Sequence, residues 1–257
     1  MFIDVGDVKL YATSFGPRSA PAIVAIGGWI GSWELWAEPF ALLSERWHTV
    51  AYDHRGSGAT VAPVDSITFA NLVTDLFAVL DAYGIETCTL AAESAGAQTA
   101  LSAALRTPKR IERLVIVDGM YHRDVPPDTD PFLAGLRKAY PATLDRFVQR
   151  CIPEPGCEHV KRWGRQIIDR ASQDTAIALR VVSTDTDLRG ELPNISQPTL
   201  VIHGDADAIV PIARGRELAA ALPNARLVVL PGAGHVPTLT RPAEVAREIE
   251  DFLLNRP

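Results

Sequence analysis

A serine lies where a short β-type run passes directly into an alanine-rich helical run. Residues 87–91 precede Ser94, and residues 97–105 form the helical run. Ala92 and Gly96, two residues on either side of the serine, are small enough for the chain to turn sharply from strand to helix. A serine on such a turn has an exposed Oγ above a helix N-terminus, which stabilises negative charge. The segment predicts a nucleophile elbow and covalent acyl chemistry.

Strands and helices alternate along most of the 257 residues. Apolar residues spaced three and four apart predict a helix over 69–83, which Gly84 ends. Alternating or continuous apolar runs predict strands at 8–15, 22–27, 49–52, 88–92, 114–118, 199–203 and 227–230. Repeated alternation favours the α/β class, with a mostly parallel, doubly wound sheet and helices on both faces.

The alternation stops between residues 119 and 190. This stretch contains prolines at its start and two helical patterns, at 132–151 and 158–184, but no convincing strand. A helical insertion between two strands of such a sheet lies over the carboxyl ends of the strands, where ligands bind. We expect a core domain of 1–118 and 191–257 with a helical lid at 119–190. The alternative is a packing appendage that does not contact substrate.

Two further residues are suited to activate the serine. Asp207 follows the buried run 199–203, and His235 lies in a glycine-rich loop after the run 227–230. Loops that follow parallel strands open on the same sheet edge, so a base and its orienting acid can meet Ser94 there. The chain order Ser, Asp, His is that of one particular fold. Asp118, at the end of the strand after the elbow helix, stays open as an alternative acid.

Three more segments complete a family resemblance. Residues 26–33 are similar to an oxyanion loop, 192–204 resemble the re-entry from a lid into a sheet, and 53–60 match the turn D-x-R-G-x-G-x-S with Thr60 in the last position. With the elbow and the two loops above, they make the chain resemble the α/β-hydrolase fold family over nearly its whole length outside the lid. Ala92 and Gly27 depart from the family pattern, which more often has glycine and histidine there.

The resemblance implies a role for each residue of the motifs. Ser94 would attack a carbonyl carbon, His235 would accept the serine proton and later protonate the leaving group, and Asp207 would orient the imidazole. The backbone N–H groups of Trp29 and Ala95 would form the oxyanion hole.

Substrate contacts are less constrained by the pattern. Trp29 is expected in the pocket wall, and Glu93, beside the nucleophile, lines the pocket or pairs with a nearby base. Trp163, with Arg162 and Arg165, is expected to hold an aromatic or anionic substrate, and a solvated helix face explains the arginines equally well.

Composition restricts the partners. The net charge is −6 and no basic tract exceeds two residues, which argues against nucleic-acid binding. Three cysteines without metal-ligand spacing, and no apolar run of membrane-spanning length, indicate a cytoplasmic protein without a metal or cofactor. We expect a monomer or homodimer whose partner is a small-molecule substrate.

The sequence therefore predicts a serine esterase or lactonase that acts on a small to medium, largely apolar substrate through an acyl-serine intermediate. One alternative is a C–C bond hydrolase or enol-lactonase of aromatic ring-cleavage products. Another, from a different class, is a slow-turnover ligand-binding or signalling receptor on the same fold.

Overall fold

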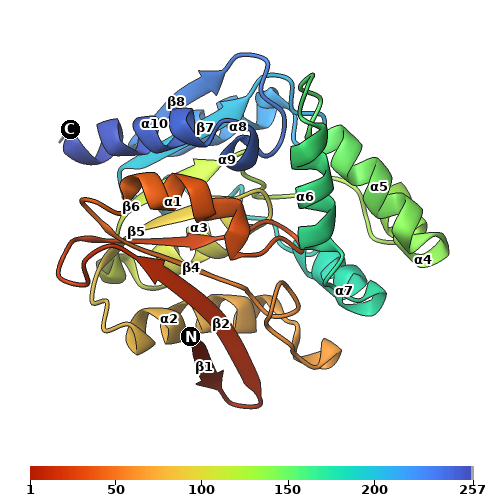
Figure 1. Cartoon of the computed structure of the whole chain (residues 1–257), viewed down its shortest axis with the longest axis horizontal. Helices are drawn as coiled ribbons and strands as arrows, with labels where there is room; N and C mark the ends of the chain where they lie inside the picture. The colour runs from red at the N-terminus through yellow and green to blue at the C-terminus, as the bar shows by residue number, and fades with distance from the viewer. Residues whose placement is uncertain (256–257) are drawn as a thin grey trace.

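The computed structural model describes residues 1–255. A single sheet lies at the centre of the fold that these residues form (Figure 1). Its strands are ordered β1-β2-β4-β3-β5-β6-β7-β8. Their bounds are β1 (Phe2–Val5), β2 (Val8–Phe15), β3 (Ala22–Ile26), β4 (His48–Tyr52), β5 (Cys88–Glu93), β6 (Ile111–Val117), β7 (Thr199–Gly204) and β8 (Ala225–Leu230). β2 pairs antiparallel with β1 and with β4, and all other pairs are parallel. The prediction of a mostly parallel, doubly wound sheet is confirmed.

Successive side chains of a strand point to opposite faces of the sheet, so apolar strands leave both faces to be covered, and helices pack on each. In β3, Ile23 and Ala25 pack into one core, and Val24 and Ile26 pack into the other. The first core is covered by α1 (Ala37–Leu43) and α10 (Pro242–Leu254), and the second by α2 (Phe69–Ala82), α3 (Gly96–Arg106) and α8 (Ile212–Ala221). Short elements complete the core: α9 (Pro237–Thr240), η1 (Trp33–Trp36), η2 (Val64–Ser66), η3 (Pro108–Arg110) and η4 (Leu192–Asn194).

The strand bounds differ from the sequence prediction by up to three residues, and one strand was not predicted. β6 begins at Ile111, three residues before the predicted start. β1 was not predicted, because only Ile3 of its four residues is buried and the strand forms the edge of the sheet.

Four helices lie between β6 and β7, and they stand together beside the sheet (Figure 1). They are α4 (Pro131–Lys138), α5 (Tyr140–Cys151), α6 (Glu158–Ile168) and α7 (Gln173–Thr184). Each predicted helical pattern is thus divided into two helices. Pro141 lies in the first turn of α5, where its missing N–H needs no partner, and the Ser172 hydroxyl accepts the Thr175 N–H at the start of α7.

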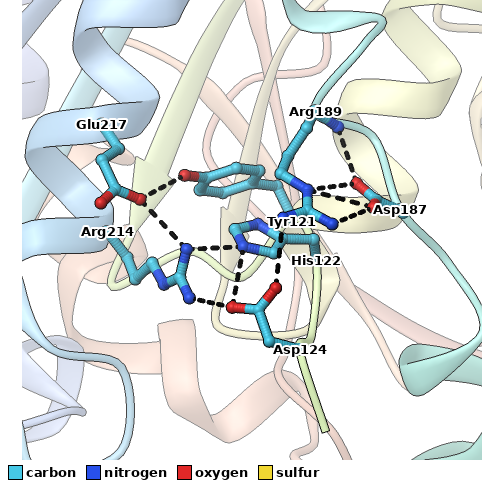
Figure 2. Close-up of polar contacts among 7 residues, drawn as sticks. All are labelled: Tyr121, His122, Asp124, Asp187, Arg189, Arg214 and Glu217. Atoms are coloured by element: carbon cyan, nitrogen blue, oxygen red, sulfur yellow. Dashed lines mark hydrogen bonds and ion pairs between the residues drawn. The ribbon is translucent and has the colours of Figure 1, made fainter. Parts of the chain in front are cut away.

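A polar network joins the two connections of this helical group to α8. Its members are Tyr121, His122 and Asp124 after β6, Asp187 and Arg189 before β7, and Arg214 and Glu217 on α8 (Figure 2). Arg214 donates to both Asp124 and Glu217, and Arg189 donates to Asp124 at 3.1 Å. The network therefore ties both ends of the helical group to the core. No helix within residues 1–255 is long and apolar enough to cross a membrane.

Candidate active site

Ser94 lies on the turn between β5 and α3. Its φ of +52° is in the left-handed region, which residues other than glycine rarely adopt, and its hydroxyl is thereby raised above the strand end. Gly96 is required two residues later, because a Cβ atom there would lie 2.5 Å from the Gly27 carbonyl oxygen. Ala92 is fully buried within β5, where its methyl group is accommodated. The strained serine and the close approach at Gly96 together form the predicted elbow.

His235 links the serine to Asp207 by two hydrogen bonds. His235 Nε2 is 2.8 Å from Ser94 Oγ, and His235 Nδ1 is 2.7 Å from Asp207 Oδ2. All three side chains are buried. The structure therefore brings together the three residues that the sequence predicted as catalytic.

The charges within this group favour an ionised acid beside a basic imidazole. Burial alone would raise the pKa of Asp207, but the His235 charge and hydrogen bond, with the N–H groups of Ile209 and Val210, lower it. Burial would likewise lower the pKa of His235, and the carboxylate of Asp207 outweighs it and raises that pKa. Asp207 thus holds a proton on Nδ1 and leaves Nε2 free to accept one.

Asp118 lies beside Asp207 and has a different environment. Burial, and then the negative charge of Asp207, raise the pKa of Asp118 well above its usual range, whereas the pKa of Asp207 is lowered. Its Oδ1 accepts the Gly204 N–H at 2.9 Å. Asp118 has no hydrogen bond to the imidazole of His235, and Asp207 holds that position instead.

Asp118, His203 and Asp207 place potential metal-ligand atoms within 4.8 Å of one another. The chemistry of these donors does not fit a metal. His203 Nε2 donates to the Val210 carbonyl at 2.8 Å, and both oxygens of Asp207 accept hydrogen bonds from the chain. We interpret the group as the hydrogen-bonded surroundings of the acid.

The backbone N–H groups of Ala95 and Trp29, the predicted oxyanion hole, follow Ser94 and Gly28 along the chain. The Ala95 N–H lies at the N-terminal end of α3, and neither it nor the Trp29 N–H donates to a backbone carbonyl within residues 1–255. Gly28 brings the loop that holds Trp29 against Ser94, since a Cβ atom at Gly28 would be 3.0 Å from Ser94 Cβ. His54 Nε2 lies 3.0 Å from the Gly28 carbonyl oxygen and braces the loop. From the sequence, His54 was assigned only to a structural turn, and nothing in the pattern indicated its contact with the Gly28 carbonyl.

An apolar cavity of about 60 Å³ opens at Ser94. Trp29 and Glu93 line it, as predicted, beside His235. Residues from α5 and α6 close it: Phe147, Val148, Cys151, Gly164, Ile167 and Ile168. Burial raises the pKa of Glu93 to about 7, although the nearby His235 charge and the Thr238 hydroxyl oppose this change.

The prediction for Trp163 is wrong. Its side chain is 53% exposed, because α6 turns Gly164, Ile167 and Ile168 towards the cavity and Trp163 towards solvent. Arg165 is paired with carboxylates of the helical group, at 2.7 Å from Asp145. Its charge is therefore already balanced.

A second cavity, of about 100 Å³, meets the first at Ser94, Trp29 and Phe147. Three arginines line it, Arg123, Arg150 and Arg180, which sequence reasoning missed. They are separated along the chain and belong to no motif, so only the folded arrangement brings them together.

Comparison with known proteins supports the same assignment. A family model described as the alpha/beta hydrolase fold matches residues 21–163 and 160–242. A pimeloyl-[acyl-carrier protein] methyl ester esterase of Nitrosomonas europaea is 30% identical over 88% of this chain and 93% of its own. A protein of Pseudomonas syringae, provisionally named carbamate hydrolase RutD, is 29% identical over 93% of this chain and 95% of its own.

Among solved structures, the enol-lactonase from Burkholderia xenovorans LB400 is similar with a TM-score of 0.92 and 28% identity. The match covers 99% of this chain and all of that one. The family model, these hydrolase relatives and the geometry at Ser94 agree: the chain belongs to the α/β-hydrolase fold family and is a hydrolase.

Proposed function

We propose that this protein is a serine hydrolase that cleaves a carboxylic ester or lactone through an acyl-serine intermediate. The observation that carries the proposal is the continuous hydrogen-bonded chain from Asp207 through His235 to Ser94, with a cavity at the serine. The similarity to a methyl ester esterase and to an enol-lactonase supports this class of bond.

The geometry supplies each step of the reaction. His235 Nε2 takes the proton as Ser94 Oγ forms a bond to the carbonyl carbon, and the carbonyl oxygen becomes an oxyanion between the N–H groups of Trp29 and Ala95. His235 then returns that proton to the departing alkoxide as the ester C–O bond breaks. Water, deprotonated by the same nitrogen, attacks the acyl-serine, and the acid product leaves with Ser94 restored.

The helices between β6 and β7 have a part in this proposal as a lid. α5 and α6 close the apolar cavity over Ser94, and Trp29 Nε1 donates to the Ala176 carbonyl in α7 at 2.8 Å. A closed, largely apolar site excludes water, so that fixed dipoles rather than solvent stabilise the developing charge. We assign this lid to residues 119–190.

Reaction with a fluorophosphonate tests the nucleophile directly. We expect one adduct on the native protein by intact mass, and none on Ser94→Ala. Ser172→Ala is the matched control, because Ser172 caps α7 and lines neither cavity at Ser94, so its replacement should leave the adduct in place. If neither the native protein nor the control forms an adduct, the serine is not activated, and the slow-turnover receptor becomes the better explanation.

A further inference from the structure

The second cavity at Ser94 has an unbalanced positive charge. Its lining contains three arginines and no aspartate or glutamate. Arg180 is neutralised by Asp130, whose carboxylate accepts from its Nε at 2.6 Å. Arg150 donates to the Ala208 carbonyl, and neither Arg150 nor Arg123 has a carboxylate within salt-bridge distance among the described residues.

Arg123 is the unusual member of the three. Its only hydrogen bond within residues 1–255 is a long one, 3.4 Å from Nε to the Ser183 hydroxyl. Its terminal nitrogens therefore have no hydrogen-bond partner among the described residues, and its side chain lines the second cavity. Burial and the positive charge of Arg180 lower the pKa of Arg123 to about 9, which leaves it protonated at neutral pH.

The segment that holds Arg123 is fixed on both sides. Its neighbours His122 and Asp124 both contact Arg214 of α8, and Tyr121 donates to Glu217 at 3.2 Å (Figure 2). These contacts hold the backbone on either side of Arg123, whose guanidinium has no carboxylate partner of its own. The nearby carboxylate of Asp130 favours the charged form of Arg123 but is already paired with Arg180, and a part-buried cation without a carboxylate partner of its own is unfavourable unless a ligand supplies one.

We propose that the second cavity binds a carboxylate group of the substrate, with Arg123 as its main partner. This inference rests on the proposed function and narrows it to esters or lactones that carry a free carboxylate close to the scissile carbonyl. The planar guanidinium pairs with a carboxylate through two parallel hydrogen bonds. The cavity, at about 100 Å³, has room for a carboxylate on a short carbon chain that reaches Ser94.

A matched pair of substrates tests the proposal. One is the monomethyl ester of a four-carbon dicarboxylic acid, and the other is the corresponding neutral dimethyl ester. We expect the native enzyme to favour the carboxylate form, and Arg123→Met to reduce the ratio of the two kcat/KM values by about 10- to 100-fold, as for other hydrogen bonds to charged groups. Arg123→Lys keeps the charge and should retain part of the preference.

Arg162→Met is the control variant, because Arg162 is exposed on α6 and lines neither cavity. It removes the same formal charge and should leave the ratio unchanged. Labelling by the neutral fluorophosphonate is followed in parallel. If labelling is normal but the native enzyme does not prefer the carboxylate ester, or if Arg123→Met has the same preference, the carboxylate site alone is overturned. If the native protein is not labelled at all, the proposed function is overturned.

Competition distinguishes the kind of anion. Succinate and inorganic phosphate are each tested as inhibitors of neutral-ester hydrolysis in the native enzyme and Arg123→Met. Stronger inhibition by succinate, weakened in the variant, supports a carboxylate site. Stronger inhibition by phosphate, or inhibition by succinate that is equal in both proteins, contradicts it.

Discussion

Replacing each of two neighbouring carboxyl groups by its amide tests which one is the acid. In Asp207→Asn, the amide oxygen should stay on the side of Oδ1, which accepts the N–H groups of Ile209 and Val210 at 2.7 and 3.0 Å. Turning it round would lose two hydrogen bonds of about 1 kcal/mol each and oppose donor to donor. The amide N–H₂ therefore faces His235 Nδ1.

A donor in that position selects the wrong form of the imidazole. Nδ1 of His235 must then carry the lone pair and Nε2 the proton, so Nε2 can no longer accept the proton of Ser94. We expect kcat to fall by about 10⁴-fold, equivalent to about 5.5 kcal/mol in the barrier. The assay is steady-state hydrolysis of a neutral activated ester, with the melting temperature of each variant as the control for folding.

Asp118→Asn is the matched variant. Because burial favours the neutral form of Asp118, and its Oδ1 accepts the Gly204 N–H, the amide should replace it with little change and kcat should fall by about tenfold or less. A large loss in Asp118→Asn with a small loss in Asp207→Asn would refute this reasoning and make Asp118 the acid.

Two further changes test other parts of the structure. The negative charge of ionised Glu93 raises the pKa of His235, so Glu93→Gln should lower the pKa of His235 and move the acid limb of kcat/KM to lower pH. If the midpoint of that limb, measured between pH 5 and 9, is the same in both proteins, the coupling is contradicted. The carboxylate of Asp75 lies 2.6 Å from Nε of the buried Arg55 and balances its charge. Asp75→Asn removes this counter-charge and should lower the free energy of unfolding, measured in urea, by about 3–5 kcal/mol. Asp4→Asn, which breaks an exposed ion pair, should change it by less than about 1 kcal/mol, and equal effects would contradict the role of burial.

Most of the fold could be predicted because its information is local. The strands of the parallel sheet are short apolar runs between turn residues, and the helix at 69–82 has a clear apolar face that ends at Gly84. β1 was missed because an edge strand with one buried residue has no such pattern. The helical group was predicted as a region, but its division into four helices depends on single residues, such as Pro141 and Ser172.

The site divides in the same way. The meeting of Ser94, Asp207 and His235 could be predicted because each lies in a motif at the end of a strand, and the sheet brings strand ends together. Arg123 could not be predicted, because what distinguishes it is the absence of a carboxylate partner in the folded chain. The sequence does not distinguish an arginine without a carboxylate partner from one with a partner. Trp163, which the sequence pattern favoured as a substrate contact, faces solvent.

The charges around His235 link the proposed carboxylate site to catalysis. Asp207 and Glu93 raise the pKa of His235, and Arg123 lowers it. A substrate carboxylate bound to Arg123 would offset that positive charge and make His235 a stronger base once the substrate is in place. The acid limb of kcat, which reports the enzyme–substrate complex, should therefore lie at higher pH than that of kcat/KM, which reports the free enzyme. The separation should appear with the carboxylate ester and be absent with the neutral diester; equal limbs for the carboxylate ester would show that Arg123 and His235 do not act on the same bound substrate.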